Sequence, residues 1–146
     1  MQSKMKALQN SILALGNALD ECTSYACKVH LDGLSDNIID MARDIKFCRY
    51  ERAYGAIEAE KNYLSEMVFE DDDYLTADEY IAMLHKLNAL KSAYAACGED
   101  FSDCIRRANI DGLYSVADTI ESIFADYCAL TYETAFEEIA DAFDGE

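Results

Sequence analysis

The fold is indicated by residues 5–29, which read MKALQNSILALGNALDECTSYACKV. Apolar residues recur there at alternating spacings of three and four: Met5, Leu8, Ile12, Leu15, Leu19, Cys22, Ala26 and Val29. This spacing is the heptad pattern of a helix that buries one face against other helices. The flanking positions are small or neutral, whereas a free two-stranded zipper has charge pairs there. We therefore expect this helix to pack inside a bundle.

The composition is that of one soluble helical domain. The chain has 146 residues, enough to bury a core, and no proline, although average usage is about 5%. No apolar run is long enough for a signal peptide or a membrane span. We expect a cytoplasmic protein, in which the six cysteines are reduced thiols instead of a disulfide framework.

These patterns predict an all-α fold, with one helical domain over residues 1–146. We expect an antiparallel bundle with coiled-coil-like heptad packing between the helices. The four main helices are predicted at about 3–30, 35–69, 76–97 and 113–143, with a short helix near 100–107.

Local signals give the expected helix ends. The sequence Thr76-Ala77-Asp78-Glu79 fits a capping box that begins the third helix. Ser35 or Asp36 is expected to cap the second helix, after the Asp32-Gly33 turn. Gly98 is expected to end the third helix, and Gly55 to kink the second.

An internal repeat is one interpretation of two similar pairs of segments. Leu31-Asp32-Gly33-Leu34 resembles Ile110-Asp111-Gly112-Leu113, and Tyr50-Glu51 resembles Tyr132-Glu133. The offsets of these pairs differ by three residues, so a duplication of helical hairpins 1–69 and 76–146 would require an insertion. Chance similarity in a chain rich in alanine and acids is the alternative.

The net charge of −17 is concentrated in two segments that contain no lysine or arginine, 62–85 and 108–146. If 113–143 is one helix, Asp126, Glu133, Glu137, Asp141 and Asp144 form an acidic ridge on it. Glu70, Asp71, Asp72 and Asp73 form an acidic loop. Both are predicted to bind a partner. Phe136, Ile139 and Phe143 turn to another side and are a candidate apolar interface, through which the chain could form a homodimer.

Motifs for metal or cofactor chemistry are weak, and we expect no cofactor, no metal and no catalytic residue. Cys27 and His30 share one helical face, but no second pair has zinc-finger spacing. Asp118-x-x-Glu121 and Glu138-x-x-Asp141 resemble the paired acidic motifs of helical nucleoside-triphosphate pyrophosphatases, which implies a metal-dependent nucleotide pyrophosphatase. On one unbroken helix, however, these two motifs would lie about 25 Å apart and could not share a metal ion.

One basic segment contains Arg43, Lys46, Arg49 and Arg52. In a chain this acidic, we interpret it as pairing with acids of the same chain or of a second subunit, and not as a nucleic-acid site.

The charge distribution favours a non-enzymatic, acidic protein-binding module. Its predicted partner is a basic protein surface, such as the groove of a nucleic-acid-handling enzyme. The chain would then be an inhibitor, of the kind carried by phages and mobile elements, that mimics the charge of DNA and binds neither nucleic acid nor membrane itself. The alternatives are a structural or adaptor bundle that self-associates through apolar heptad faces, and the pyrophosphatase.

Overall fold

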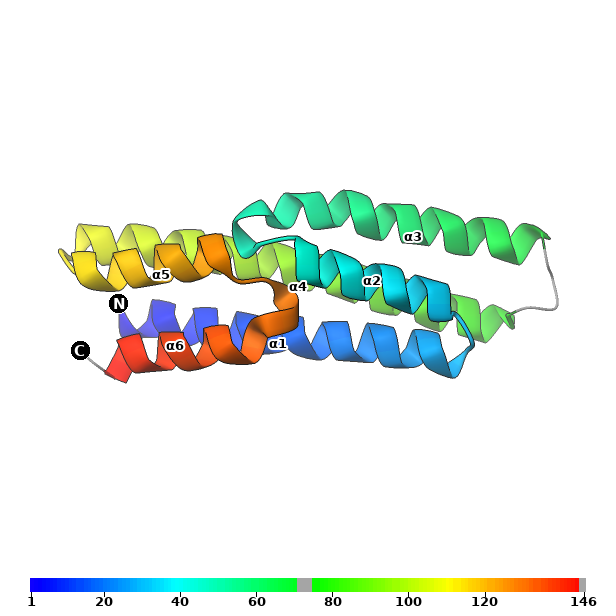
Figure 1. Ribbon diagram of the computed structural model, residues 1–146, viewed down its shortest axis with the longest axis horizontal. Coiled ribbons are helices and arrows are strands. Elements are labelled where there is room, and N and C mark those ends of the chain that lie inside the picture. Colours follow the sequence, from blue (N-terminus) through cyan, green and yellow to red (C-terminus); the bar gives the residue numbers. More distant parts are fainter. Residues whose placement is uncertain (71–74, 145–146) are drawn as a thin grey trace.

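A computed structural model describes residues 1–70 and 75–144, and these residues form an all-α bundle (Figure 1). Six α-helices and two short 3₁₀ helices follow one another in this order: α1 (Gln2–Lys28), α2 (Asp32–Asp44), η1 (Phe47–Arg49), α3 (Tyr50–Glu70), α4 (Ala77–Ile110), α5 (Tyr114–Asp126), η2 (Ala129–Thr131) and α6 (Tyr132–Asp144). The predicted fold class is confirmed, whereas several predicted helix ends are wrong.

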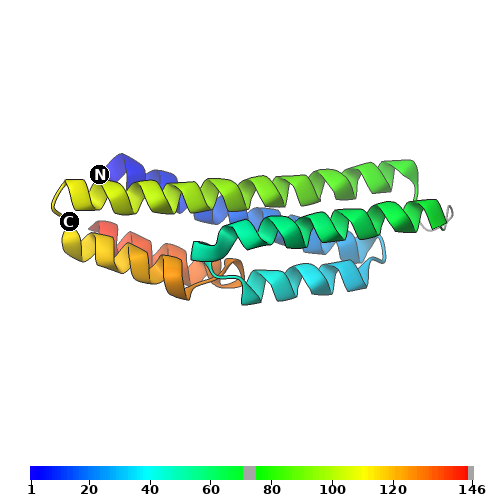
Figure 2. The same cartoon turned by 90° about the horizontal axis from the view of Figure 1, so that it is seen from above.

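The molecule consists of two four-helix bundles placed end to end. The long helices α1 and α4 run antiparallel along the whole length and contact each other throughout (Figures 1 and 2). At one end α2 and α3 complete the bundle, and at the other end α5 and α6 do so. Helices α2 and α5 point toward each other and end near the middle of the molecule.

The apolar seam of α1 is the centre of the core. Its residues Met5, Leu8, Ile12, Leu15, Leu19, Cys22 and Ala26 are all buried. Helix α4 buries a matching series, which comprises Met83, Leu87, Leu90, Tyr94, Cys97, Phe101, Cys104 and Ala108. The periodicity of residues 5–29 therefore predicted the buried face of α1, while coiled-coil packing between the two long helices remains a prediction.

The third predicted helix and the short one after it are a single helix, α4. Gly98 lies inside α4 and not at its end. The close approach of the Tyr50 ring explains the glycine, because a Cβ atom at this position would come within 3.0 Å of that ring. The capping box is confirmed: the amide of Glu79 donates to Thr76 Oγ1 at 3.1 Å, and the amide of Thr76 donates to Glu79 Oε1 at 3.0 Å.

The predicted helices 35–69 and 113–143 are each broken in two. Backbone at Ile45 and Tyr127 is extended, and the chain reverses direction at both places. Neither break contains glycine or proline. Tertiary contacts stabilise them: the amide of Phe47 donates to the carbonyl of Tyr127 at 3.0 Å, and the buried ring of Phe47 packs on Phe101 with ring centroids 5.1 Å apart. Gly55 lies inside α3 without a break.

The second helix also begins earlier than predicted, at Asp32. Ser35 does not cap it. The side chain of Ser35 is buried, and its hydroxyl donates to the carbonyl of Thr23 in α1 at 3.4 Å. His30, in the turn before α2, has a positive φ of 64°.

The two halves of the chain correspond at a constant offset of 82 residues. Helix α2 matches α5 end to end, η1 matches η2, and α3 and α6 begin at the equivalent residues Tyr50 and Tyr132. The isolated bridge between Lys46 and Cys128 joins two equivalent positions, which places it on a pseudo-twofold axis. No three-residue insertion is needed, because Leu31 corresponds to Leu113. Common descent of the halves remains a prediction.

Candidate partner-binding surface

Helices α5 and α6 lie side by side and antiparallel, and neither contains a lysine or arginine (Figure 1). Their inward side chains, among them Ala117, Ile120, Ile123, Ala135 and Ile139, belong to the buried core. Their exposed carboxylates define what we call the acidic layer: Asp118, Glu121, Asp126, Glu133, Glu137, Glu138, Asp141 and Asp144. The packing of apolar faces thus leaves the carboxylates of both helices in solvent.

The predicted acidic ridge is corrected at one residue. Asp126 ends α5, while Glu133, Glu137, Asp141 and Asp144 belong to α6. Because the helix breaks between them, Asp126 does not continue the ridge. The four residues on α6 still share one side of that helix by their spacing, and all four are exposed.

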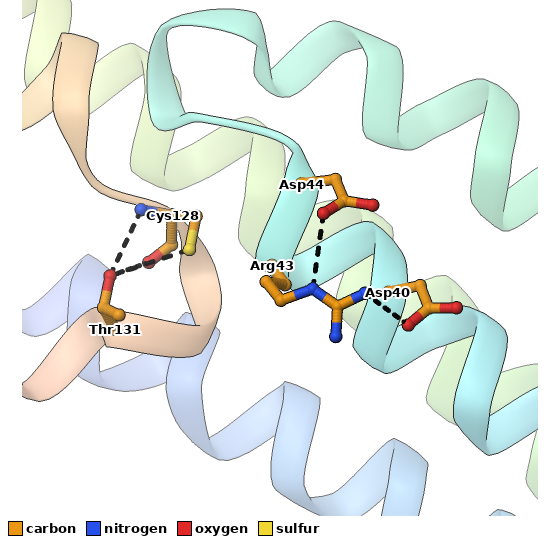
Figure 3. A network of polar contacts seen from close by, with 5 residues as sticks. All are labelled: Asp40, Arg43, Asp44, Cys128 and Thr131. Atoms are coloured by element: carbon orange, nitrogen blue, oxygen red, sulfur yellow. Dashed lines mark hydrogen bonds and ion pairs between the residues drawn. The ribbon is translucent and has the colours of Figure 1, made fainter.

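The carboxylates of the acidic layer lie on two helices without lysine or arginine, and they lack neutralising partners. Among the described residues, none of its carboxylates forms an ion pair. Acids elsewhere do. Glu58 accepts from Lys61 at 2.9 Å and from Lys91 at 3.0 Å, and these hydrogen bonds lower the pKa of Glu58. Arg43 pairs with Asp40 and Asp44 (Figure 3).

Two tyrosines hold the start of α6 in place. The hydroxyl of Tyr127 donates to the carboxylate of Glu138, which raises the pKa of Tyr127. The ring of Tyr132 packs on Gly16 of α1, and its hydroxyl donates to Asp20 at 3.5 Å. Partial burial and the nearby carboxylate of Asp20 raise the pKa of Tyr132. Both hydroxyls are therefore neutral donors at physiological pH, so they anchor the layer without adding charge.

The candidate apolar interface is only partly exposed. Ile139 is fully buried, and Phe136 and Phe143 are partly buried against the core. Burial excludes Ile139 from a free interface, whereas Phe143 lines a pocket together with residues of α1, and an interface through Phe136 and Phe143 stays a prediction. Of the predicted acidic loop, Asp71, Asp72 and Asp73 lie outside the described residues, and the backbone of Glu70 ends α3.

The two motifs that resemble those of pyrophosphatases, Asp118-x-x-Glu121 and Glu138-x-x-Asp141, lie on the neighbouring antiparallel helices α5 and α6. The expectation that one unbroken helix separates them by about 25 Å was therefore wrong. Even so, within residues 1–70 and 75–144 no group of three or more His, Cys, Asp or Glu side chains could hold a metal ion. Cys27, which belongs to the weak zinc motif of the sequence, instead donates from its thiol to Ser35 Oγ at 3.4 Å.

The basic segment is divided by the structure. Arg43 pairs with acids of its own helix, as predicted, whereas Lys46, Arg49 and Arg52 line a pocket. Sequence reasoning missed this pocket because it depends on the break after α2, which no residue in the segment signals.

Comparisons with known proteins give no relative: no protein-family model, no curated protein and no solved structure matches this chain. In the part of the chain that is described, no helix is both long and apolar enough to cross a membrane.

Proposed function

We propose that this protein is a non-enzymatic binding module whose acidic layer docks on a basic surface of another protein. The observation that carries the proposal is the set of eight exposed, unpaired carboxylates on two adjacent helices that contain no base. Such a surface attracts a cationic partner over long distances and accelerates its association.

The partner class that fits best is a nucleic-acid-handling protein. Its basic groove is built to neutralise a dense array of phosphates, and a rigid array of carboxylates occupies the same groove by the same charge complementarity. The chain then acts as an inhibitor that mimics the charge of DNA. The rigidity comes from the buried faces of α5 and α6, so little conformational entropy is lost on binding.

The test compares two variants that lose the same number of charges. The first neutralises the α6 ridge with Glu133→Gln, Glu137→Gln, Asp141→Asn and Asp144→Asn. The matched control neutralises four exposed acids that form no ion pair and lie outside the acidic layer: Glu21→Gln, Asp36→Asn, Glu66→Gln and Asp78→Asn. Each immobilised protein is incubated with the heparin-binding fraction of a cell lysate.

Wild type and the control variant are expected to capture the same proteins, and the ridge variant to lose them. Capture should also fall steeply between about 50 mM and about 200 mM salt, because exposed charges are screened. If the ridge variant captured the same proteins as the control variant, the acidic layer would not be the binding surface. If capture did not depend on salt, the self-associating adaptor would be the better account.

The pyrophosphatase alternative has a separate test. Titration of magnesium into the protein, followed by calorimetry, should give no heat of binding at millimolar metal if the acidic layer serves only to bind a protein. Binding of magnesium that is lost in Asp118→Asn and Glu138→Gln would favour the enzyme instead.

A further inference from the structure

A pocket beside the break between α2 and η1 is lined by three cationic side chains. Its volume is about 500 Å³, and Lys46, Arg49 and Arg52 line it together with Ile45 and Ala125. Pockets for small molecules in proteins span roughly 300–1,000 Å³. The basic pocket, as we call it, is therefore large enough for a small ligand.

The three cations come from three successive parts of the chain. Lys46 has extended backbone just before η1, Arg49 ends η1 and Arg52 lies in the first turn of α3, and all three line the same pocket. Lys46 Nζ is held by the carbonyl oxygen of Asp126 at 2.9 Å. The guanidinium groups of Arg49 and Arg52 have no hydrogen bond or ion pair within the described residues.

Unpaired arginines are unexpected in this chain, which has 29 acids for 12 lysines and arginines. The one carboxylate that lines the basic pocket, that of Asp44, already accepts from Arg43 Nε at 3.4 Å (Figure 3). Arg43 also pairs with Asp40, so Asp44 offsets part of the charge, but three cations against one carboxylate leave the pocket lining with a net positive charge.

The fold itself does not require these cations. At the offset of 82 residues, Lys46, Arg49 and Arg52 correspond to Cys128, Thr131 and Thr134, and the second half makes the same break without a base. Several buried or partly buried residues that follow the two breaks are nevertheless identical in the two halves. The equivalent pairs are Tyr50 and Tyr132, Ala53 and Ala135, and Ile57 and Ile139. The second half thus serves as an internal control, which indicates that the break does not require the three cations.

We propose that the basic pocket binds the phosphate group of a small organic phosphate. A phosphomonoester carries a charge of about −2 and several acceptor oxygens, which suits two guanidinium forks and one ammonium. The apolar side chains of Ile45 and Ala125 offer a surface for the organic part of the ligand. The pocket borders the acidic layer at Asp126, whose carbonyl accepts from Lys46, but the phosphate site does not depend on the proposed protein-binding function.

The experiment is calorimetric titration of the full chain with adenosine monophosphate, adenosine, inorganic phosphate and citrate. It is done at about 0.15 M salt, where repulsion from acids more than about 8 Å away is screened. We expect saturable binding of one adenosine monophosphate per chain, weaker binding of inorganic phosphate, and none of adenosine or citrate. Arg49→Gln and Arg52→Gln should each weaken the affinity about ten-fold or more, since each removes a charged hydrogen-bond donor.

The matched control is the double variant Arg106→Gln and Arg107→Gln. It removes two exposed arginines that pair with Asp103 and Asp111 on α4 and the following turn, away from the basic pocket. This variant should bind adenosine monophosphate as wild type does. No binding of adenosine monophosphate, equal binding of citrate, or equal loss of affinity in the control and the pocket variants would each overturn the proposal.

Discussion

Two glycines show how single residues position the helices of this bundle. Gly16 and Gly98 are equivalent at the offset of 82, and each lies under the ring of a tyrosine from the other half, Tyr132 and Tyr50 respectively. A side chain at either position would collide with a ring. These glycines therefore set how closely α6 approaches α1, and α3 approaches α4.

Replacement of either of these glycines by alanine should lower the stability of the fold, whereas replacement of a glycine with free space around it should raise the stability. Gly98→Ala should lower the free energy of unfolding by about 1–3 kcal/mol, because the new methyl overlaps the ring of Tyr50. Gly55→Ala should raise it by about 0.5–1 kcal/mol, since Gly55 is inside α3 with nothing within 4 Å. Urea denaturation of both variants measures the difference. Equal stability of the two would show that Tyr50 does not pack on Gly98.

Buried thiols make the stability depend on alkaline pH. Burial raises the pKa of Cys22 from 9.0 to about 12, and burial also raises the pKa of Cys97. Between pH 9 and 12 the unfolded chain loses these protons while the folded chain keeps them. The free energy of unfolding should therefore fall as pH rises in this window, by up to about 1.4 kcal/mol per pH unit for each thiol.

The measurement is urea denaturation at several pH values between 9 and 12. The double variant Cys22→Ala and Cys97→Ala should have a shallower slope of stability against pH than wild type, whatever its absolute stability. Identical slopes would show that these thiols ionise equally in the folded and unfolded chain.

At the scale of elements, periodicity predicted what is buried but not where helices break. The buried face of α1 could be predicted because side chains at spacings of three and four lie on the same face of a helix. The breaks after Asp44 and Asp126 were not readable, since their stability comes from contacts between distant residues such as Phe47 and Tyr127. Gly98 was wrongly predicted to end the helix, because the sequence alone does not distinguish a glycine that ends a helix from one on which an aromatic ring packs.

The same limit applies to the candidate surfaces. Glu133, Glu137, Asp141 and Asp144 share a side of α6 as predicted, because that inference needed only a local helix. The inclusion of Asp126 needed an unbroken helix and was wrong, and the basic pocket could not be foreseen because it exists only where a break brings Lys46 beside α5.

The second break depends on a hydroxyl at Thr131. Thr131 Oγ1 accepts from the amide of Cys128 at 3.3 Å and donates to its carbonyl at 3.1 Å. Thr131→Val should lower the free energy of unfolding by about 1 kcal/mol, as loss of a helix cap does. Thr134→Val, at an exposed position on α6 with no such bonds, is the matched control. Thermal denaturation that gave the same midpoint for both variants would contradict this role of Thr131.

At the scale of the whole molecule, the two halves share a plan but differ in charge. Two bundles use the same long helices, and the pseudo-twofold axis passes through the bridge between Lys46 and Cys128. The acids near Arg43, Lys61 and Lys91 are neutralised in the first bundle, while the acidic layer of the second is not. This difference is the reason why we propose the second bundle, and not the first, as the one that binds a partner.

The central claim is that the acidic layer occupies a basic groove that otherwise binds nucleic acid. It is tested most directly by adding double-stranded DNA to a protein captured on the immobilised chain. The account predicts that DNA releases the captured protein, and that the free chain in turn displaces the protein from DNA over the same concentration range. A captured protein that held DNA and this chain at the same time would contradict the account.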